Sequence, residues 1–307
     1  MHRHERAPFF WALALTLSFA LIEWVGGVLT GSLALIADAG HMFSDSMALA
    51  LAALAAWIAR RPRSLRHSYG FARAEVIVAA VNGVLMLAVI VMIVIEAIER
   101  LRAPVPVAGG GVVLIAGIGL IINAIVATMI SRGEKTLNTR AALIHVIGDL
   151  LGSVAALLAG AVIFFTGWLP IDPILSLAIA ALILFSTLNL LKSALHVLME
   201  GVPTTIDLAE VGRELALLEG VNSVHDLHVW TISSGQVALS AHIELEEMVA
   251  WPRILGSAKT TLREQFAIDH VTLQPEIALK QPYEPKVRIV PLGRGQGAVV
   301  RGQKNQD

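Results

Sequence analysis

The sequence contains no cysteine and little charge. Cysteine is absent from its 307 residues, and Asp, Glu, Lys and Arg together make up 15%. Without cysteine, disulfide scaffolds, thiolate zinc fingers, iron–sulfur clusters and cysteine nucleophiles are excluded. Soluble domains carry about 25% charged residues, so the low charge argues against a soluble enzyme. The net charge is −1, and no basic excess points to nucleic acid as a partner.

Signature motifs of nucleotide-driven pumps and common hydrolases are also missing. The sequence has no Gly-x-x-x-x-Gly-Lys-Ser/Thr loop, which would bind nucleotide phosphates, and no His-Glu-x-x-His or Gly-x-Ser-x-Gly motif. We therefore expect a protein that is not an enzyme and that uses neither a nucleotide nor an organic cofactor.

Long apolar runs dominate what is present. Hydrophobic residues make up 56% of the chain, and the mean hydropathy is +0.71. An apolar run of about 20 residues can cross a bilayer as a helix. After an N-terminal segment of residues 1–8, we predict an all-α transmembrane domain over residues 9–203 with six spans. These are Phe9–Leu29, Leu33–Ala59, Val76–Ile95, Val107–Ile130, Ala141–Phe165 and Pro173–Leu191.

The basic residues between the spans predict the orientation. Arginine and lysine gather in the N-terminal segment and in the connections at 60–75 and 131–140, whereas the alternate connections have few or none. Positively charged connections stay in the cytoplasm. We expect a multi-pass protein of the cell inner membrane, embedded in lipid, with both termini in the cytoplasm.

After Lys192 the composition becomes that of a soluble domain, which we place at residues 204–283. Its expected helices are Ile206–Leu218 and Trp251–Phe266, and its expected strands are Val221–Thr231, Gln236–Glu246 and His270–Gln274. The order αββαβ predicts a small α+β sandwich. Residues 284–307 are rich in glycine and polar residues, and we expect a disordered tail there.

Acidic side chains lie inside the predicted spans with no lysine or arginine to pair with them. A charged side chain at the bilayer centre costs about 2.5–3.5 kcal/mol even on the insertion scale. Protonation, contact with water or a cation from solution would each offset that cost, and the last of these predicts a cation site. The acidic residues and the two histidines of the spans are Glu23, Asp38, His41, Asp45, His145 and Asp149.

The spacing of four of these residues predicts a metal site. His41 and Asp45 are four residues apart, as are His145 and Asp149, and residues four apart share one helix face. Two such helices facing each other would offer two imidazoles and two carboxylates, a set that suits zinc in tetrahedral coordination. Magnesium or calcium would prefer oxygen ligands alone. The alternative is that each side chain is satisfied by a neighbouring helix.

Two further acidic residues have open roles. Asp38 shares a face with His41 and could be a ligand, a proton carrier or, as we prefer, a partner that orients a ligand. Glu23 could be linked to proton movement or bond to a polar group of another helix.

The soluble domain contains a second candidate cluster. His225 and His228 lie in the first predicted strand, His242 lies in the next, and Glu276 follows the third. The alternative for these residues is an ordinary surface without a ligand.

Five segments spread over about residues 9 to 277 carry a resemblance to a known family. They are Ser32–Ser46 (SLALIADAGHMFSDS), His67–Glu75 (HSYGFARAE), Leu143–Ser153 (LIHVIGDLLGS), His225–Trp230 (HDLHVW) and Thr272–Glu276 (TLQPE). In these segments the sequence resembles the cation diffusion facilitator family, whose members export zinc and similar divalent ions.

The resemblance implies a homodimer with six membrane helices per protomer. It also implies a cytoplasmic metal-sensing and dimerisation domain of metallochaperone-like, ferredoxin-like αββαβ fold. The implied transport site consists of His41, Asp45, His145 and Asp149. The implied cytoplasmic site consists of His225 or His228 together with His242 and Glu276.

The expected function is therefore proton-coupled export of zinc from the cytoplasm, with cadmium or cobalt as further cargo. Zinc would be the transported substrate and also a regulatory ligand of the soluble domain. The rival hypotheses are a membrane metalloenzyme, whose zinc would activate a water, and a metal-gated channel, which could not move zinc uphill.

Overall fold

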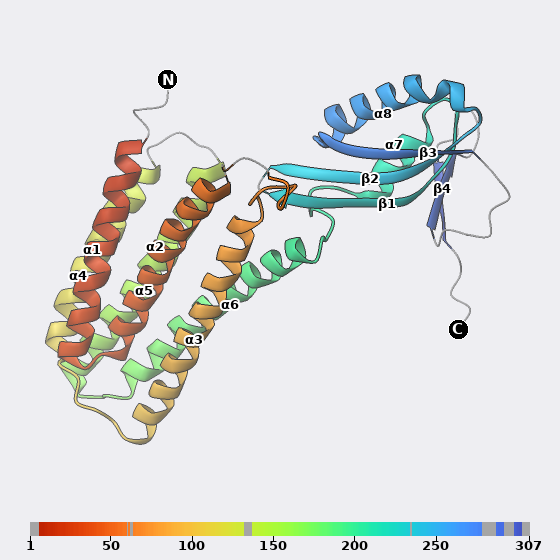
Figure 1. Ribbon diagram of the computed structural model, residues 1–307. Coiled ribbons are helices and arrows are strands. Elements are labelled where there is room, and N and C mark those ends of the chain that lie inside the picture. Colours follow the sequence, from red (N-terminus) through yellow and green to blue (C-terminus); the bar gives the residue numbers. More distant parts are fainter. Residues whose placement is uncertain are drawn as a thin grey trace. The chain divides into compact units, whose positions relative to one another are not determined.

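The computed structural model describes residues 6–59, 61, 64–131, 137–233, 235–277, 287–291 and 298–302 (Figure 1). The chain forms two compact units. The first contains Met1–Ala55 and Val78–Lys192, and the second contains Ala56–Ile77 and Ser193–Asp307. Each unit has its own hydrophobic core.

Long helices at all six predicted spans confirm that part of the fold. They are α1 (Arg6–Thr30), α2 (Leu33–Ala59), α3 (Ala74–Arg102), α4 (Gly109–Ser131), α5 (Leu137–Thr166) and α6 (Ile171–Leu198). Five of them, α2 to α6, contain described stretches long and apolar enough to cross a membrane, and α1 has a shorter apolar stretch at Thr16–Thr30. Helix α3 continues beyond the predicted end, and in this additional part Glu96 and Arg100 form an ion pair of 2.7 Å along its surface.

Small side chains let the helices of the first unit pack closely. Its core contains many alanines, among them Ala37, Ala116 and Ala156, which are fully buried. Between α4 and α5 a Cβ atom at Gly160 would lie 2.9 Å from Val112. Close backbone approach of this kind is how membrane helices associate.

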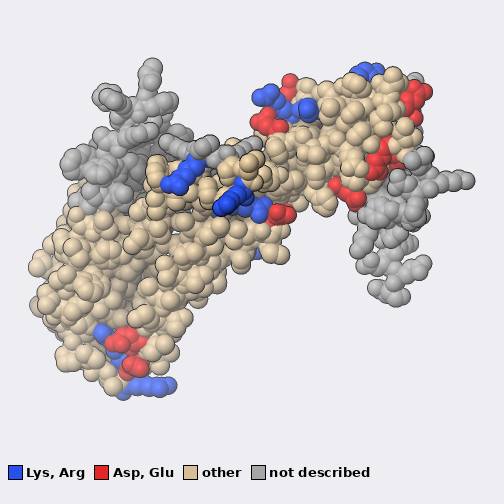
Figure 2. Space-filling view, in the orientation of Figure 1, with Lys and Arg blue, Asp and Glu red and all other residues tan. Residues whose placement is uncertain are grey.

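The outer surface of the helical unit is apolar. Large side chains such as Leu29, Phe165 and Phe185 are more than two thirds exposed. In Figure 2 the visible face of this unit carries charged side chains mainly near the end of α3. A surface of this kind matches a lipid environment rather than water.

The second unit contains the predicted αββαβ order, with a sheet that has two additional strands. The elements are α7 (Leu208–Ala216), β1 (Val221–Ser233), β2 (Gln236–Leu245), a 3-10 turn (Met248–Ala250), α8 (Trp251–Phe266), β3 (His270–Ile277), β4 (Val287–Pro291) and β5 (Ala298–Gly302). The strand order is β3-β2-β1-β4-β5. Strands β2 and β3 are parallel, and the other neighbours are antiparallel.

Strands β4 and β5 differ from the prediction that residues 284–307 form a disordered tail. The glycines and polar residues of the segment concealed the β-branched run in β4, which pairs with β1. Ile289 is 4% exposed and belongs to the core of the domain. A side chain at Gly212 of α7 would overlap Ile289, so this glycine makes room for β4.

Candidate metal centres

A histidine and two carboxylates meet inside the helical unit. His41 Nδ1 lies 3.4 Å from Asp45 Oδ2 on α2, and His41 Nε2 lies 3.8 Å from Asp149 Oδ1 on α5. The three residues offer ligand atoms that all lie within 4.8 Å of one another, as a shared metal ion requires. The side chain of Asp149 is 4% exposed, whereas those of His41 and Asp45 are 18% and 29% exposed, so the cluster is buried on the α5 side and partly open on the α2 side.

The local sequence explains this meeting. One helical turn separates His41 from Asp45, so both project from the same face of α2. Helix α5 approaches that face at Gly152, where a Cβ atom would overlap the carboxylate of Asp38. Gly148, the other small residue beside Asp149, has open space around it. A single glycine therefore permits the close approach.

The predicted fourth ligand is His145. Its backbone belongs to α5, one helical turn before Asp149, but its side chain lies outside the described part of the structure. Three of the four predicted residues are thus brought together, and the role of His145 stays a prediction.

Asp38 lies outside this cluster but belongs to a buried polar chain next to it. The Asn123 amide of α4 donates to the Ser153 hydroxyl at 3.2 Å, and that hydroxyl donates to Asp38 Oδ2 at 3.4 Å. Asp38 is 1% exposed. The sequence alone did not single out Ser153, because its role depends on the packing of α2, α4 and α5 around its hydroxyl.

Glu23 of α1 is fully buried, and within the described residues neither of its carboxylate oxygens has a hydrogen-bond partner. The alternative that Glu23 bonds to a polar group of another helix is therefore not supported within the described part of the chain. Asp38 and Asp149 are within electrostatic reach of its carboxylate.

A second cluster lies on the sheet of the other unit. Glu276 of β3 contacts two histidines, with Oε2 at 3.1 Å from His225 Nε2 and Oε1 at 2.8 Å from His242 Nδ1. His225 of β1 pairs with His242 of β2, and their ring centroids are 5.4 Å apart. The three residues again offer ligand atoms within 4.8 Å of one another.

The structure does not bring His228 to this cluster. A bulge between His225 and His228, with Asp226 in the left-handed region at φ 48°, shifts the register so that His228 pairs with Ser240. Paired residues share a face, so His225 and His228 lie on one side of the sheet but beside different partners.

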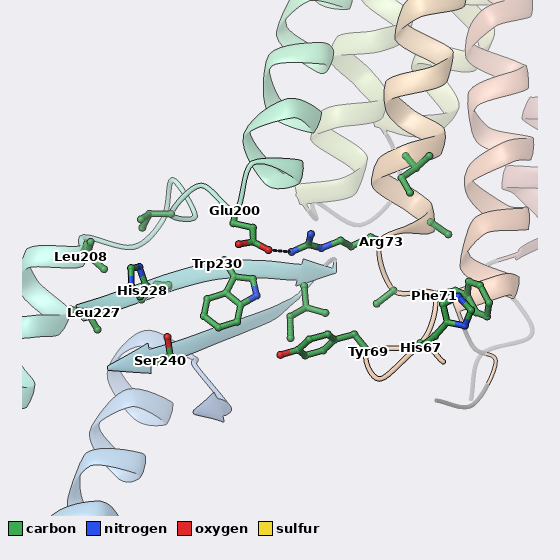
Figure 3. Close-up of a pocket in the computed structure, with 17 residues that line it drawn as sticks. His67, Tyr69, Phe71, Arg73, Glu200, Leu208, Leu227, His228, Trp230 and Ser240 are labelled. Carbon is green, nitrogen blue, oxygen red and sulfur yellow. Dashed lines mark hydrogen bonds and ion pairs between the residues drawn. The ribbon is translucent and has the colours of Figure 1, made fainter. Parts of the chain in front are cut away.

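His228 instead lines a pocket of about 850 Å³ within the second unit. Figure 3 shows it on the sheet near Trp230, with an ion pair of 3.0 Å between Arg73 and Glu200 at another part of the same pocket. Both members of that pair are more than one third exposed, so it adds little to stability.

These features define a class of protein. A bundle of apolar helices with a buried cluster of histidine and carboxylate groups belongs to a multi-pass membrane protein that handles cations. The second cluster, with the same kinds of ligand, lies in a domain with the composition of soluble proteins.

Comparison with known families agrees. The transmembrane domain of cation efflux proteins matches residues 9–199, and the cytoplasmic domain of cation efflux proteins matches residues 203–278. The chain belongs to the cation diffusion facilitator family, and it is a cation efflux transporter rather than an enzyme.

Similar proteins include three bacterial transporters. Zinc transporter ZitB of Escherichia coli is 42% identical over 87% of this chain and 86% of its own. The metal cation efflux system protein CzcD of Cupriavidus metallidurans is 43% identical over 87% and 85%. The cadmium, cobalt and zinc/H⁺-K⁺ antiporter of Bacillus subtilis is 40% identical over 84% and 85%.

One solved structure is also similar. The metal-bound C-terminal domain of CzcD from Cupriavidus metallidurans is 37% identical, with a TM-score of 0.22, over 23% of this chain and 99% of that domain.

Proposed function

We propose that the protein is a zinc/proton antiporter that exports zinc from the cytoplasm, with cadmium and cobalt as further cargo. The cluster of His41, Asp45 and Asp149 is the observation that carries this proposal. Imidazole with carboxylate is a ligand set suited to zinc, and similar transporters are named for zinc, cadmium and cobalt. The transport site consists of these three residues and His145.

The chemistry of the ligands couples metal to protons. Histidine binds metal through a neutral ring nitrogen, and carboxylates bind it when deprotonated, so zinc binding releases protons. Zinc enters the deprotonated site from the cytoplasm. When the site opens to the other side, protons at a higher concentration compete for the same groups and displace the ion. Such a cycle requires two conformations that zinc and protons favour differently.

Glu23 and Asp38 extend this coupling. A buried carboxylate without a hydrogen-bond partner is stable only with a proton or a cation close to it, and Glu23 is in that state among the described residues. We assign Glu23 as a proton carrier that does not bind zinc, and Asp38 as a buried acid within electrostatic reach of both Glu23 and Asp149. Glu23→Gln should leave zinc binding intact and make zinc flux less dependent on the pH gradient.

The other unit acts in regulation. His225, His242 and Glu276 form a cytoplasmic zinc site in a domain that holds a homodimer together, consistent with the match to the family's cytoplasmic domain. The protein lies in the inner membrane, and the arginines between the second and third spans favour a cytoplasmic location for both of its termini.

Zinc uptake into proteoliposomes containing the purified protein tests the transport function. A pH gradient imposed across the vesicle membrane should drive zinc against its own concentration gradient, and collapsing the pH gradient should stop the movement. Flux that only ever follows the zinc gradient would identify a channel and refute the antiporter. Since the Bacillus subtilis relative is named for both H⁺ and K⁺, a potassium gradient alone provides a parallel measurement.

A further inference from the structure

At the N-terminus of α2, three backbone amides are bonded to side-chain oxygens. The first amides, of Leu33 and Ala34, donate to the carboxylate oxygens of Asp172 at 2.7 and 3.4 Å. The amide of Leu35 donates to the hydroxyl of Ser32 at 3.3 Å, and the amide of Ile36 makes the first bond within the helix, to the carbonyl of Ser32 at 3.4 Å. A helix leaves four N-terminal amides without internal partners, and here one residue of a distant helix satisfies half of them.

Asp172 is built into this position. It belongs to the first turn of α6 and is fully buried. The hydroxyl of Ser32 donates to its Oδ1 at 2.6 Å, and Arg100 Nη1 of α3 lies 3.9 Å from its Oδ2. Arg100 also donates to the carbonyl of Gly31, in the turn between α1 and α2. The carboxylate therefore joins α2 to α6, and Arg100 brings α3 to the same point.

The helix capped in this way carries metal ligands. His41 lies nine residues after Ser32, about 13 Å along the helix axis. A helix transmits a shift or rotation of its end along its length because its internal hydrogen bonds keep it stiff. The direction in which His41 and Asp45 project is therefore set partly at this cap.

We propose that Asp172 is a positioning residue for metal binding: by capping α2 from α6, it fixes the height and rotation of α2 so that His41 and Asp45 face Asp149. This inference rests on the proposed transport site. Asp172 is not itself a ligand, because one hydroxyl and two amide donors occupy its oxygens. Asp172 thus differs from Glu23, another fully buried acid of the same unit, whose oxygens have no such donors among the described residues.

Cobalt binding to the full-length protein provides the test, because tetrahedral Co²⁺ has visible absorption bands that report ligand geometry. All variants are made in a His242→Ala, Glu276→Ala background, so that the cytoplasmic cluster contributes no bands. Asp172→Asn replaces one carboxylate oxygen by an amide N–H group. This group would face either the amide of Leu33 or the amide of Ala34 and the hydroxyl of Ser32, which all donate to the carboxylate in the native protein. We expect cobalt binding about tenfold weaker, with shifted bands, as for loss of a buried charged acceptor.

Two pairs of variants separate positioning from folding. Ser176 donates to the backbone carbonyl of Asp172 at 2.7 Å, within α6 itself, so Ser176→Ala is a buried control that leaves the cap intact. Ser32→Ala should weaken cobalt binding, whereas Ser32→Thr keeps a hydroxyl and should restore it. The serine pair decides the question if Asp172→Asn does not fold.

The outcomes are distinct. Unchanged bands and affinity in both Asp172→Asn and Ser32→Ala would overturn the positioning role and leave the transport site standing. A background protein without any tetrahedral cobalt bands would overturn the proposed transport site, and the positioning role with it. Altered bands in Ser176→Ala equal to those in Asp172→Asn would show a general packing defect and also overturn the proposal.

Discussion

His41 of α2 and Asp149 of α5 face each other with 3.8 Å between Nε2 and Oδ1. This separation is too long for a hydrogen bond. Two ligands of a tetrahedral zinc ion, with bonds of about 2.0–2.2 Å, lie roughly 3.3–3.5 Å apart. The pair is therefore close to the spacing at which one ion would bridge two helices that are far apart in sequence.

Removing either carboxylate should abolish zinc transport. Asp45→Ala or Asp149→Ala deletes a charged ligand, and the loss of a carboxylate from a membrane helix should not hinder membrane insertion. Zinc uptake by proteoliposomes measures the effect. Glu99→Ala, which deletes an exposed carboxylate near the end of α3, is the matched control and should transport normally. Near-normal flux in either site variant would contradict the proposed site.

The metal preference should move toward manganese when histidine is replaced by aspartate. His41→Asp leaves a harder ligand set, and His41→Asp with His145→Asp leaves carboxylates alone. The ratio of zinc flux to manganese flux should fall in two steps, while His67→Asp, an exposed change in the connection after α2, should leave it unchanged. A constant ratio in all variants would mean that cavity size, not imidazole, sets selectivity.

The cytoplasmic domain should bind zinc through β2 and β3. In a fragment of residues 202–302, the His242→Ala, Glu276→Ala double variant should show no zinc binding by isothermal titration. His228→Ala is the informative control, since this histidine pairs with Ser240 rather than with the cluster, and its titration should match that of the unaltered fragment. Identical curves for the double variant and the unaltered fragment would make the cluster an ordinary surface.

Strand β4 should contribute to the stability of this domain. Ile289→Ala removes a side chain that is 4% exposed, and the free energy of unfolding should fall. Replacement of a buried isoleucine by alanine typically costs about 2–5 kcal/mol. Denaturant unfolding of the same fragment measures the change, and Val249→Ala, at a position 82% exposed, should have little effect. Equal stabilities would show that β4 is not part of the core.

The parts that the sequence predicted well are those with local causes. A membrane span needs only a long apolar run, and residues four apart share a helix face wherever the helix lies, so His41 and Asp45 could be paired without a structure. The parts that were missed depend on distant contacts. Asp172 reads as an ordinary acidic residue at a helix start, yet it bonds to amides 138 and 139 positions earlier. The bulge in β1 is likewise hidden from strand alternation, which would put His228 on the opposite face from His225; the bulge returns His228 to the same face, but opposite Ser240 rather than His242.

Glu276 lies on β3, the outermost strand on one side of the sheet, whereas His225 lies on β1, which has neighbours on both sides. An outermost strand separates from its sheet more readily than an inner one, because only one ladder of hydrogen bonds holds it. An ion held jointly by Glu276 and the two histidines would fasten β3 to the sheet through side chains as well as through its backbone. The amide protons of β3 would then exchange with solvent more slowly when zinc is bound. The stability of this one strand would therefore rise with the concentration of zinc in the cytoplasm.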